Sequence, residues 1–121
     1  METVEQITVK AAPLDAILPK NFQVDFIKID VEGGELQVLR GGFETISRNQ
    51  PLIIFEHGLG AADCYGTRPE MVFDLLTLDC GLSVFLMDGW LRGNDCLARE
   101  EVVRQFGSGD NYYFMALPSH R

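Results

Sequence analysis

Residues 24–42 read VDFIKIDVEGGELQVLRGG, and this stretch decides the fold. Its first half is rich in β-branched and aromatic side chains, and Lys28 is the only polar residue between Phe26 and Asp30. Such a run predicts a strand that is covered on both faces. Gly33 and Gly34 permit the sharp turn that follows. The stretch therefore predicts a strand that runs through an acidic turn into a helix.

Acidic side chains mark the carboxyl ends of two predicted strands. Asp30 and Glu32 follow the first strand, and Glu56 and His57 follow the next one, Leu52–Phe55. In open α/β sheets, ligands bind outside the carboxyl ends of the strands. We therefore take these four residues as candidate catalytic residues. The carboxylates would orient an acceptor or remove its proton, and the imidazole would serve as a base near neutral pH.

Two other interpretations of these residues stay open. Asp30 would cap the following helix and Glu32 would stabilise its N-terminal dipole, with Glu35 as a further first-turn acid. Alternatively, Asp30, Glu32, Glu56 and His57 would together form an oxygen-rich divalent-metal site. We take the metal site as the less favoured of these interpretations.

The remaining pattern predicts an α/β fold with one domain over residues 1–121. Its expected elements are a short strand at Ile7–Ala11, a helical turn at Pro13–Leu18, a helix at Glu35–Arg48 weakened or broken at Gly41–Gly42, a helix at Pro69–Cys80 opened by the capping box Thr67-x-x-Glu70, a strand at Leu82–Met87, a hairpin turn at Asp88–Gly89, a helix at Ala98–Phe106 and a strand at Tyr112–Leu117. Strands alternating with helices predict a mostly parallel sheet.

Composition excludes several classes of partner. A formal net charge of −8 and a pI near 4.6 argue against binding to nucleic acid or to an anionic membrane, since both need clusters of Lys and Arg. We expect a soluble, cytoplasmic protein. Cys64, Cys80 and Cys96 are odd in number and unpaired in pattern, which supports neither a disulfide framework nor a zinc site. A metal pair of His57 and Cys64 is a weak alternative.

Three blocks of the sequence resemble one enzyme family. They are PLDAIL at Pro13–Leu18, KIDVEGGELQVLRGG at Lys28–Gly42 and PLIIFE at Pro51–Glu56. In order and spacing they resemble the central and C-terminal part of the FkbM-type methyltransferases, which use S-adenosylmethionine. The resemblance extends from about Thr8 to Pro118.

The resemblance implies a fold, a reaction and a missing part. It implies the C-terminal half of a Rossmann-like class I methyltransferase fold, whose last strand is antiparallel and lies between the two strands before it. It implies methyl transfer from S-adenosylmethionine to an oxygen of a sugar or small metabolite, with Asp30 lining the site. The family's glycine-rich cofactor turn is absent, because neither Gly58-Leu59-Gly60 nor Gly107-Ser108-Gly109 completes it. We therefore expect a truncated chain that is inactive and binds no cofactor alone.

The missing half would leave the strand that ends at Asp30 at the edge of the sheet. Unpaired backbone groups beside apolar side chains favour association with another strand. The segment Ile7–Ala11 is too short to cover this edge fully, so we expect a homodimer through the edge strand. The alternative function is a non-enzymatic α/β module that associates through this edge.

Overall fold

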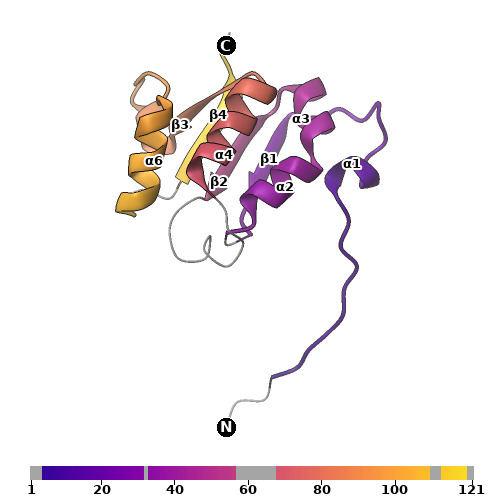
Figure 1. Cartoon of the computed structure of the whole chain (residues 1–121). Helices are drawn as coiled ribbons and strands as arrows, with labels where there is room; N and C mark the ends of the chain where they lie inside the picture. The colour runs from indigo at the N-terminus through magenta and orange to yellow at the C-terminus, as the bar shows by residue number, and fades with distance from the viewer. Residues whose placement is uncertain (1–3, 32, 57–67, 110–112, 120–121) are drawn as a thin grey trace.

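The chain folds as a four-stranded sheet with helices, and the computed structural model describes residues 4–31, 33–56, 68–109 and 113–119 (Figure 1). The helices are α1 (Leu14–Ile17), α2 (Glu35–Gly41), α3 (Phe43–Asn49), α4 (Pro69–Asp74), α5 (Met87–Leu91) and α6 (Arg99–Ser108), with a π-helical turn η2 (Leu75–Asp79). The strands are β1 (Phe26–Ile29), β2 (Leu52–Glu56), β3 (Leu82–Leu86) and β4 (Tyr113–Pro118). The predicted α/β class is confirmed.

The strand order in the sheet is β1-β2-β4-β3. β1 pairs with β2 in parallel, whereas β4 is antiparallel to both β2 and β3. The expected insertion of the last strand between the two before it is therefore confirmed. The expectation of a mostly parallel sheet is not, because β4 separates β2 from β3 and leaves one parallel pairing out of three.

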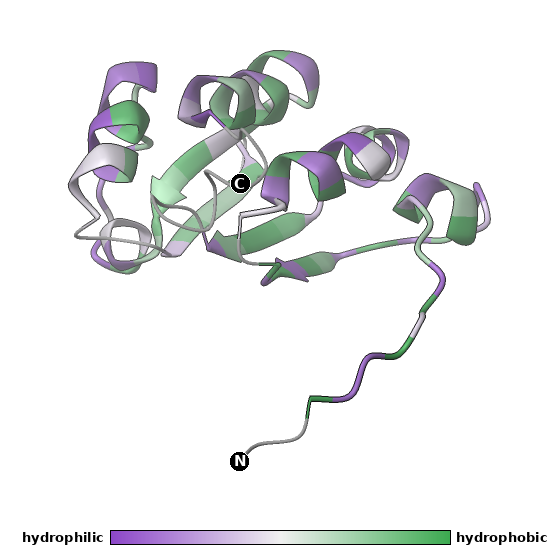
Figure 2. Cartoon of the chain, turned by 60° about the horizontal axis from the view of Figure 1, so that its bottom comes forward, coloured by the Kyte–Doolittle hydropathy of each residue, from purple (hydrophilic) through white to green (hydrophobic). Residues whose placement is uncertain are grey.

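The two faces of the sheet differ in their cover. α2, α3, α4 and α6 lie along one face (Figure 2). Side chains that point to this face form the core, and the rings of Phe55 and Phe114 stack there with centroids 5.6 Å apart. Ile29 is buried on the same face, but Phe26 is 53% exposed and Lys28 is exposed on the other. The expectation that β1 is covered on both faces is wrong, because among the described residues no helix packs over its second face.

Two glycines end one helix and start another, as predicted. α2 ends at Gly41, and Gly42 is the N-cap of α3, where it offers no side chain to cap the helix. Asp15 of α1 provides the cap instead, although Glu44 and Thr45 lie 29 and 30 positions later in the sequence. Its carboxylate accepts hydrogen bonds from the backbone N–H of Glu44 at 2.9 Å and of Thr45 at 3.0 Å, and from the Thr45 hydroxyl at 2.7 Å. α1 and α3 are thereby joined at the N-terminus of α3.

The predicted helix over Pro69–Cys80 forms in two parts. α4 begins at Pro69 after the N-cap Arg68, and the capping-box residue Thr67 lies outside the described residues. From Leu75 the turns widen, so that the Cys80 N–H donates to the Leu75 carbonyl, five residues back.

Two predicted elements are wrong. Ile7–Ala11 has no strand, because no neighbouring strand pairs with it within the described chain. Asp88–Gly89 does not turn a hairpin but lies within α5, where Asp88 forms an ion pair with Arg92 one helical turn later. β3 instead takes β4 as its antiparallel neighbour, some thirty residues further along the chain.

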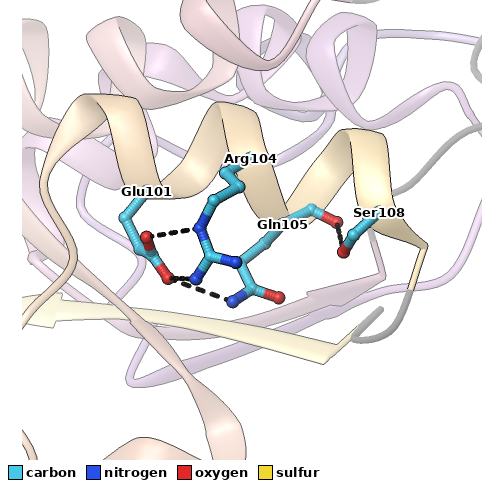
Figure 3. A network of polar contacts seen from close by, with 4 residues as sticks. All are labelled: Glu101, Arg104, Gln105 and Ser108. Carbon is cyan, nitrogen blue, oxygen red and sulfur yellow. Dashed lines mark hydrogen bonds and ion pairs between the residues drawn. The ribbon is translucent and has the colours of Figure 1, made fainter.

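The predicted C-terminal helix is present as α6, which carries a network of polar contacts among Glu101, Arg104, Gln105 and Ser108 (Figure 3). Arg104 forms an ion pair with Glu101, and the Gln105 amide donates to the same carboxylate at 3.1 Å. The bond from Arg104 lowers the pKa of Glu101. Arg104 is exposed and Gln105 is buried, so these contacts form a local network that runs from the surface of α6 to its covered side. α6 is the longest described helix, and no helix in the described ranges is long and apolar enough to cross a membrane.

Candidate functional site

Two of the predicted site residues come together at the carboxyl ends of β1 and β2. Asp30 directly follows β1, and Glu56 is the last residue of β2. Both line a cavity of about 40 Å³, together with Tyr113 at the start of β4, which lies opposite Glu56 in the ladder. Because β1 and β2 are parallel, their carboxyl ends lie side by side, and the two acidic residues come together there. The other two predicted residues, Glu32 and His57, lie outside the described residues.

The turn after β1 separates Asp30 from the helix that follows. Gly33 has φ 100°, a left-handed conformation that side chains disfavour, and Gly34 is the N-cap of α2. No side chain makes a capping hydrogen bond at this N-cap. The interpretation of Asp30 as a helix cap is therefore wrong. The Asp30 side chain is exposed at the carboxyl end of β1 and lines the small cavity there.

A third carboxylate, that of Glu35, lies near the carboxyl ends of β1 and β2. Glu35 is the first residue of α2, and only 2% of its surface is exposed. It accepts backbone hydrogen bonds from Gly33 and from its own N–H, while its Oε2 has no hydrogen-bond partner among the residues that the structure describes. Burial raises the pKa of Glu35, and the nearby carboxylates of Glu56 and Asp30 raise it further, although the two backbone bonds oppose this. The site therefore contains a buried acid that holds its proton more firmly than usual.

Glu35 was interpreted from the sequence only as a first-turn helix acid. The signal for its burial was its position. Leu36 and Leu39 lie on the covered side of α2, and Glu35 is four residues before Leu39, so it belongs to the same face. A buried carboxylate whose pKa is perturbed by burial and by neighbouring charges is a candidate functional group.

Replacing Glu35 with glutamine should raise the free energy of unfolding at pH 7, because the neutral amide removes the cost of holding a charged carboxylate in a buried position whose pKa is raised. Because the pKa of Glu35 is higher in the folded state than in the unfolded state, the folded protein loses stability as pH rises. Below the unfolded pKa of about 4.5 both states are protonated, and the cost of the buried charge appears as pH rises through the folded pKa. Urea unfolding at pH 7 and near pH 4 measures this, and the advantage of the variant should vanish at the lower pH.

The exposed first-turn acid of α3 provides the control for this experiment. Glu44→Gln should change stability at neither pH, because the Glu44 side chain is exposed. A loss of stability in Glu35→Gln at pH 7 would contradict the prediction, since it would mean that the folded state needs the charged carboxylate.

Other groups in the described residues are weaker candidates for a metal site, a nucleophile or a binding site. No group of three or more His, Cys, Asp or Glu in the described ranges is arranged to hold a metal ion. Cys80 is buried, which raises the pKa of its thiol and makes it a poor nucleophile, whereas Cys96 is exposed and Cys64 is outside the described residues. A larger hollow of about 530 Å³ lies between α1 and α2, but Gln37 is its only polar side chain.

Comparison with known proteins places this strand, turn and helix in a family. A profile of the family described as Methyltransferase FkbM domain matches residues 1–82, which is more than half of the 121-residue sequence. The match includes α1, the β1 turn, α2, α3, β2 and α4, and it ends where β3 begins. Comparisons with curated proteins and with solved structures gave no match. The chain therefore belongs to the FkbM methyltransferase domain family.

Proposed function

We propose that this chain supplies the acceptor side of a methyl transfer from S-adenosylmethionine to a hydroxyl oxygen of a sugar or small metabolite. The observation that carries this proposal is the meeting of Asp30 and Glu56 at the carboxyl ends of two adjacent parallel strands. Ligands of open α/β sheets bind outside the carboxyl ends of the strands. Membership of a methyltransferase family supports the reaction type.

The proposed chemistry of this chain's residues is proton transfer and positioning. A hydroxyl oxygen that forms a bond to a methyl group must lose its proton, and the exposed carboxylate of Asp30 is the group proposed to accept it. Glu56 would hold a second hydroxyl of the acceptor. Glu32 and His57 are proposed for the same site from their positions in the sequence.

The cavity at the carboxyl ends of β1 and β2 does not fit the methyl donor. A cavity of about 40 Å³ is much smaller than the several hundred cubic ångströms that a ligand of this size needs. The sequence also lacks a complete glycine-rich turn after a strand. We therefore propose that the donor is held by residues outside this sequence. The position of β4 between β2 and β3 supports a Rossmann-like class I arrangement, in which the donor-binding strands would lie beyond β1.

This chain alone should bind S-adenosylmethionine no more tightly than about 1 mM, which corresponds to about 4 kcal/mol. The physical reason is the small size of the cavity at the strand ends. Titration calorimetry at pH 7 measures this, with S-adenosylhomocysteine as a second ligand that should also give no saturable heat. Saturable binding tighter than 1 mM would place the donor site within these 121 residues and would contradict the proposal.

A second candidate function is association through the outer edge of β1, which pairs with no strand on that side in the part of the chain that the structure describes. β1 is the terminal strand in the order β1-β2-β4-β3, and its Phe26 is 53% exposed. An edge strand with an exposed aromatic side chain is a template for pairing with another strand. In this proposal the chain is a module that forms a homodimer through β1.

A further inference from the structure

A groove of about 360 Å³ lies beside β3 and the end of β4, at the side of the sheet opposite β1. Its volume is in the range of small-molecule sites. Val84 of β3 belongs to the core, and because side chains alternate along a strand, Ser83 and Phe85 point to the opposite face of the sheet. Leu117 of β4 pairs with Ser83 and lies on this face as well. These side chains line the groove from the sheet.

The opposite wall of the groove comes from α5 and the loop that follows it. α5 packs against β3 and β4, and Gly93 ends it with φ 80°. The Gly93 N–H donates to the Trp90 carbonyl at 3.1 Å, and the Asn94 N–H donates to the Gly89 carbonyl at 2.8 Å. This pair of hydrogen bonds is the Schellman motif, which fixes the direction in which the chain leaves a helix. The position of the loop relative to α5 is therefore set by its backbone.

The walls are also fastened to the sheet. The Leu97 N–H donates to the Val84 carbonyl of β3 at 2.7 Å, which holds the far end of the loop. The hydroxyls of Ser83 and Ser119 are hydrogen-bonded at 2.6 Å, which holds the chain after β4 against β3. The groove is thus shaped before a ligand binds, and binding need not order these segments.

The lining of the groove combines an exposed aromatic ring with short polar groups. Trp90 is 39% exposed. The polar groups are the hydroxyls of Ser83 and Ser119, the amide of Asn94 and the carboxylate of Asp95. Among the described residues that line the groove, Asp95 is the only charged one. One flat apolar surface beside several hydrogen-bonding groups is complementary to a pyranose ring, which has a face of C–H groups and a rim of hydroxyls.

We propose that this groove is a binding site for a neutral saccharide. The indole of Trp90 stacks on the C–H face of one pyranose ring. The carboxylate of Asp95 accepts hydrogen bonds from neighbouring hydroxyls, and the amide of Asn94 both donates and accepts. A nucleoside would also stack on an indole, but four hydrogen-bonding side chains around one exposed ring suit a ligand with many hydroxyls better than a flat base.

The groove is separate from the cavity at the carboxyl ends of β1 and β2. β4 begins at that cavity with Tyr113 and reaches the groove with Pro118. At about 3.4 Å per residue, this length of strand places the two about 17 Å apart. All lining residues of the groove also follow residue 82, where the family match ends. Membership of the family therefore does not account for the groove.

Trp90 is the only tryptophan of the sequence, so its indole N–H gives a signal that reports on this groove alone. The full chain, labelled with ¹⁵N, is titrated at pH 7 with cellotetraose, maltotetraose and chitotetraose up to about 20 mM. At least one of these neutral saccharides should shift the indole signal saturably, with a dissociation constant of about 1 mM. Adenosine at the same concentration should cause no saturable shift.

Exposed side chains allow the site to be tested without loss of the fold. Asp95→Ala should weaken saccharide binding at least fivefold, because the hydroxyls lose their acceptor. Trp90→Ala, followed by calorimetry, should weaken binding at least tenfold. Leu91→Ala is the control, since Leu91 is 69% exposed on the same helix but does not line the groove. Asp30→Asn should also leave the binding unchanged, which separates this site from the proposed methyl-transfer site.

Three results would overturn the inference. The absence of a saturable shift with all three saccharides would show that the groove is not a saccharide site. Saccharide binding of unchanged strength in Asp95→Ala would place the ligand elsewhere on the chain. A saturable shift with adenosine alone would identify a nucleoside site instead. All three results would leave the proposed methyl transfer at Asp30 and Glu56 untouched.

Discussion

Replacing Asp15 with alanine should lower the free energy of unfolding by about 3 kcal/mol, because three hydrogen bonds to one carboxylate are lost together. Two of them satisfy backbone N–H groups in the first turn of α3, whose own N-cap is Gly42 and supplies no side chain. The third holds the Thr45 hydroxyl, and Thr45 is buried. The variant therefore leaves a helix end uncapped and α1 detached from α3. Urea unfolding followed by circular dichroism at pH 7 measures the loss.

A graded series distinguishes capping from a general effect of charge. Asp15→Asn keeps the oxygen that serves Thr45 but turns an amide donor toward the N–H of Glu44, so it should lose about 1 kcal/mol. Asp25→Ala removes an exposed carboxylate just before β1 and should have little effect. An Asp15→Ala chain as stable as the wild type would show that α3 does not depend on this cap.

The same carboxylate should make the protein sensitive to acid. Burial alone would raise the pKa of Asp15, but the hydrogen bonds from Thr45 and Glu44 and the charge of Arg48 hold it below its usual value. A lowered folded pKa means that the stabilisation is present above the unfolded pKa, near 3.9, and is lost as pH falls through the folded pKa. The stability difference between the wild type and Asp15→Ala should therefore shrink below about pH 4.

Asp30→Asn should reduce methyl transfer at least tenfold, a loss of about 1.4 kcal/mol in transition-state stabilisation. The amide keeps the shape of the side chain but cannot accept the proton of an acceptor hydroxyl. The assay uses a polypeptide in which a donor-binding half of an FkbM relative precedes Met1, with labelled S-adenosylmethionine and a sugar acceptor. Turnover is expressed per folded molecule.

Two comparisons make the Asp30 result specific. Asp25→Asn changes a carboxylate at the opposite end of the same strand and should leave turnover unchanged. Asp30→Asn should also leave the unfolding midpoint unchanged, because Gly34 and not Asp30 is the N-cap of α2. Full turnover together with a lower midpoint would show that the acid is structural and that the proposed role is wrong.

The sequence could predict those structural elements that depend on residues within or next to the element itself. The β1 turn, the break at Gly41–Gly42 and β2 depend on nearby glycines and apolar runs, and all are present in the structure. The position of β4 followed from the family resemblance rather than from its residues. The segment Ile7–Ala11 shows the limit of such reasoning, because a strand needs a neighbour and an alternating pattern does not say whether the chain provides one.

The candidate site was predictable in its position but not in its composition. The strand-end rule located Asp30 and Glu56, which the parallel pairing of β1 and β2 brings together. The burial of Glu35 depends on how α2 packs over the sheet, which residue spacing suggests only in outline. The capping of α3 by Asp15 was out of reach, because it joins residues 29 and 30 positions apart through side-chain geometry.

The place of β4 in the sheet constrains how the protein can be made. β2 and β3 do not pair with each other, and β4, which contains the latest described strand residues in the sequence, joins them. Before the ribosome has synthesised β4, β3 has no strand with which to pair. The ring of Phe55 likewise has no ring to stack on until Phe114 has been synthesised. Final folding must therefore wait until translation has passed β4, and a nascent chain stalled before Tyr113 would expose two separate apolar strand edges to chaperones.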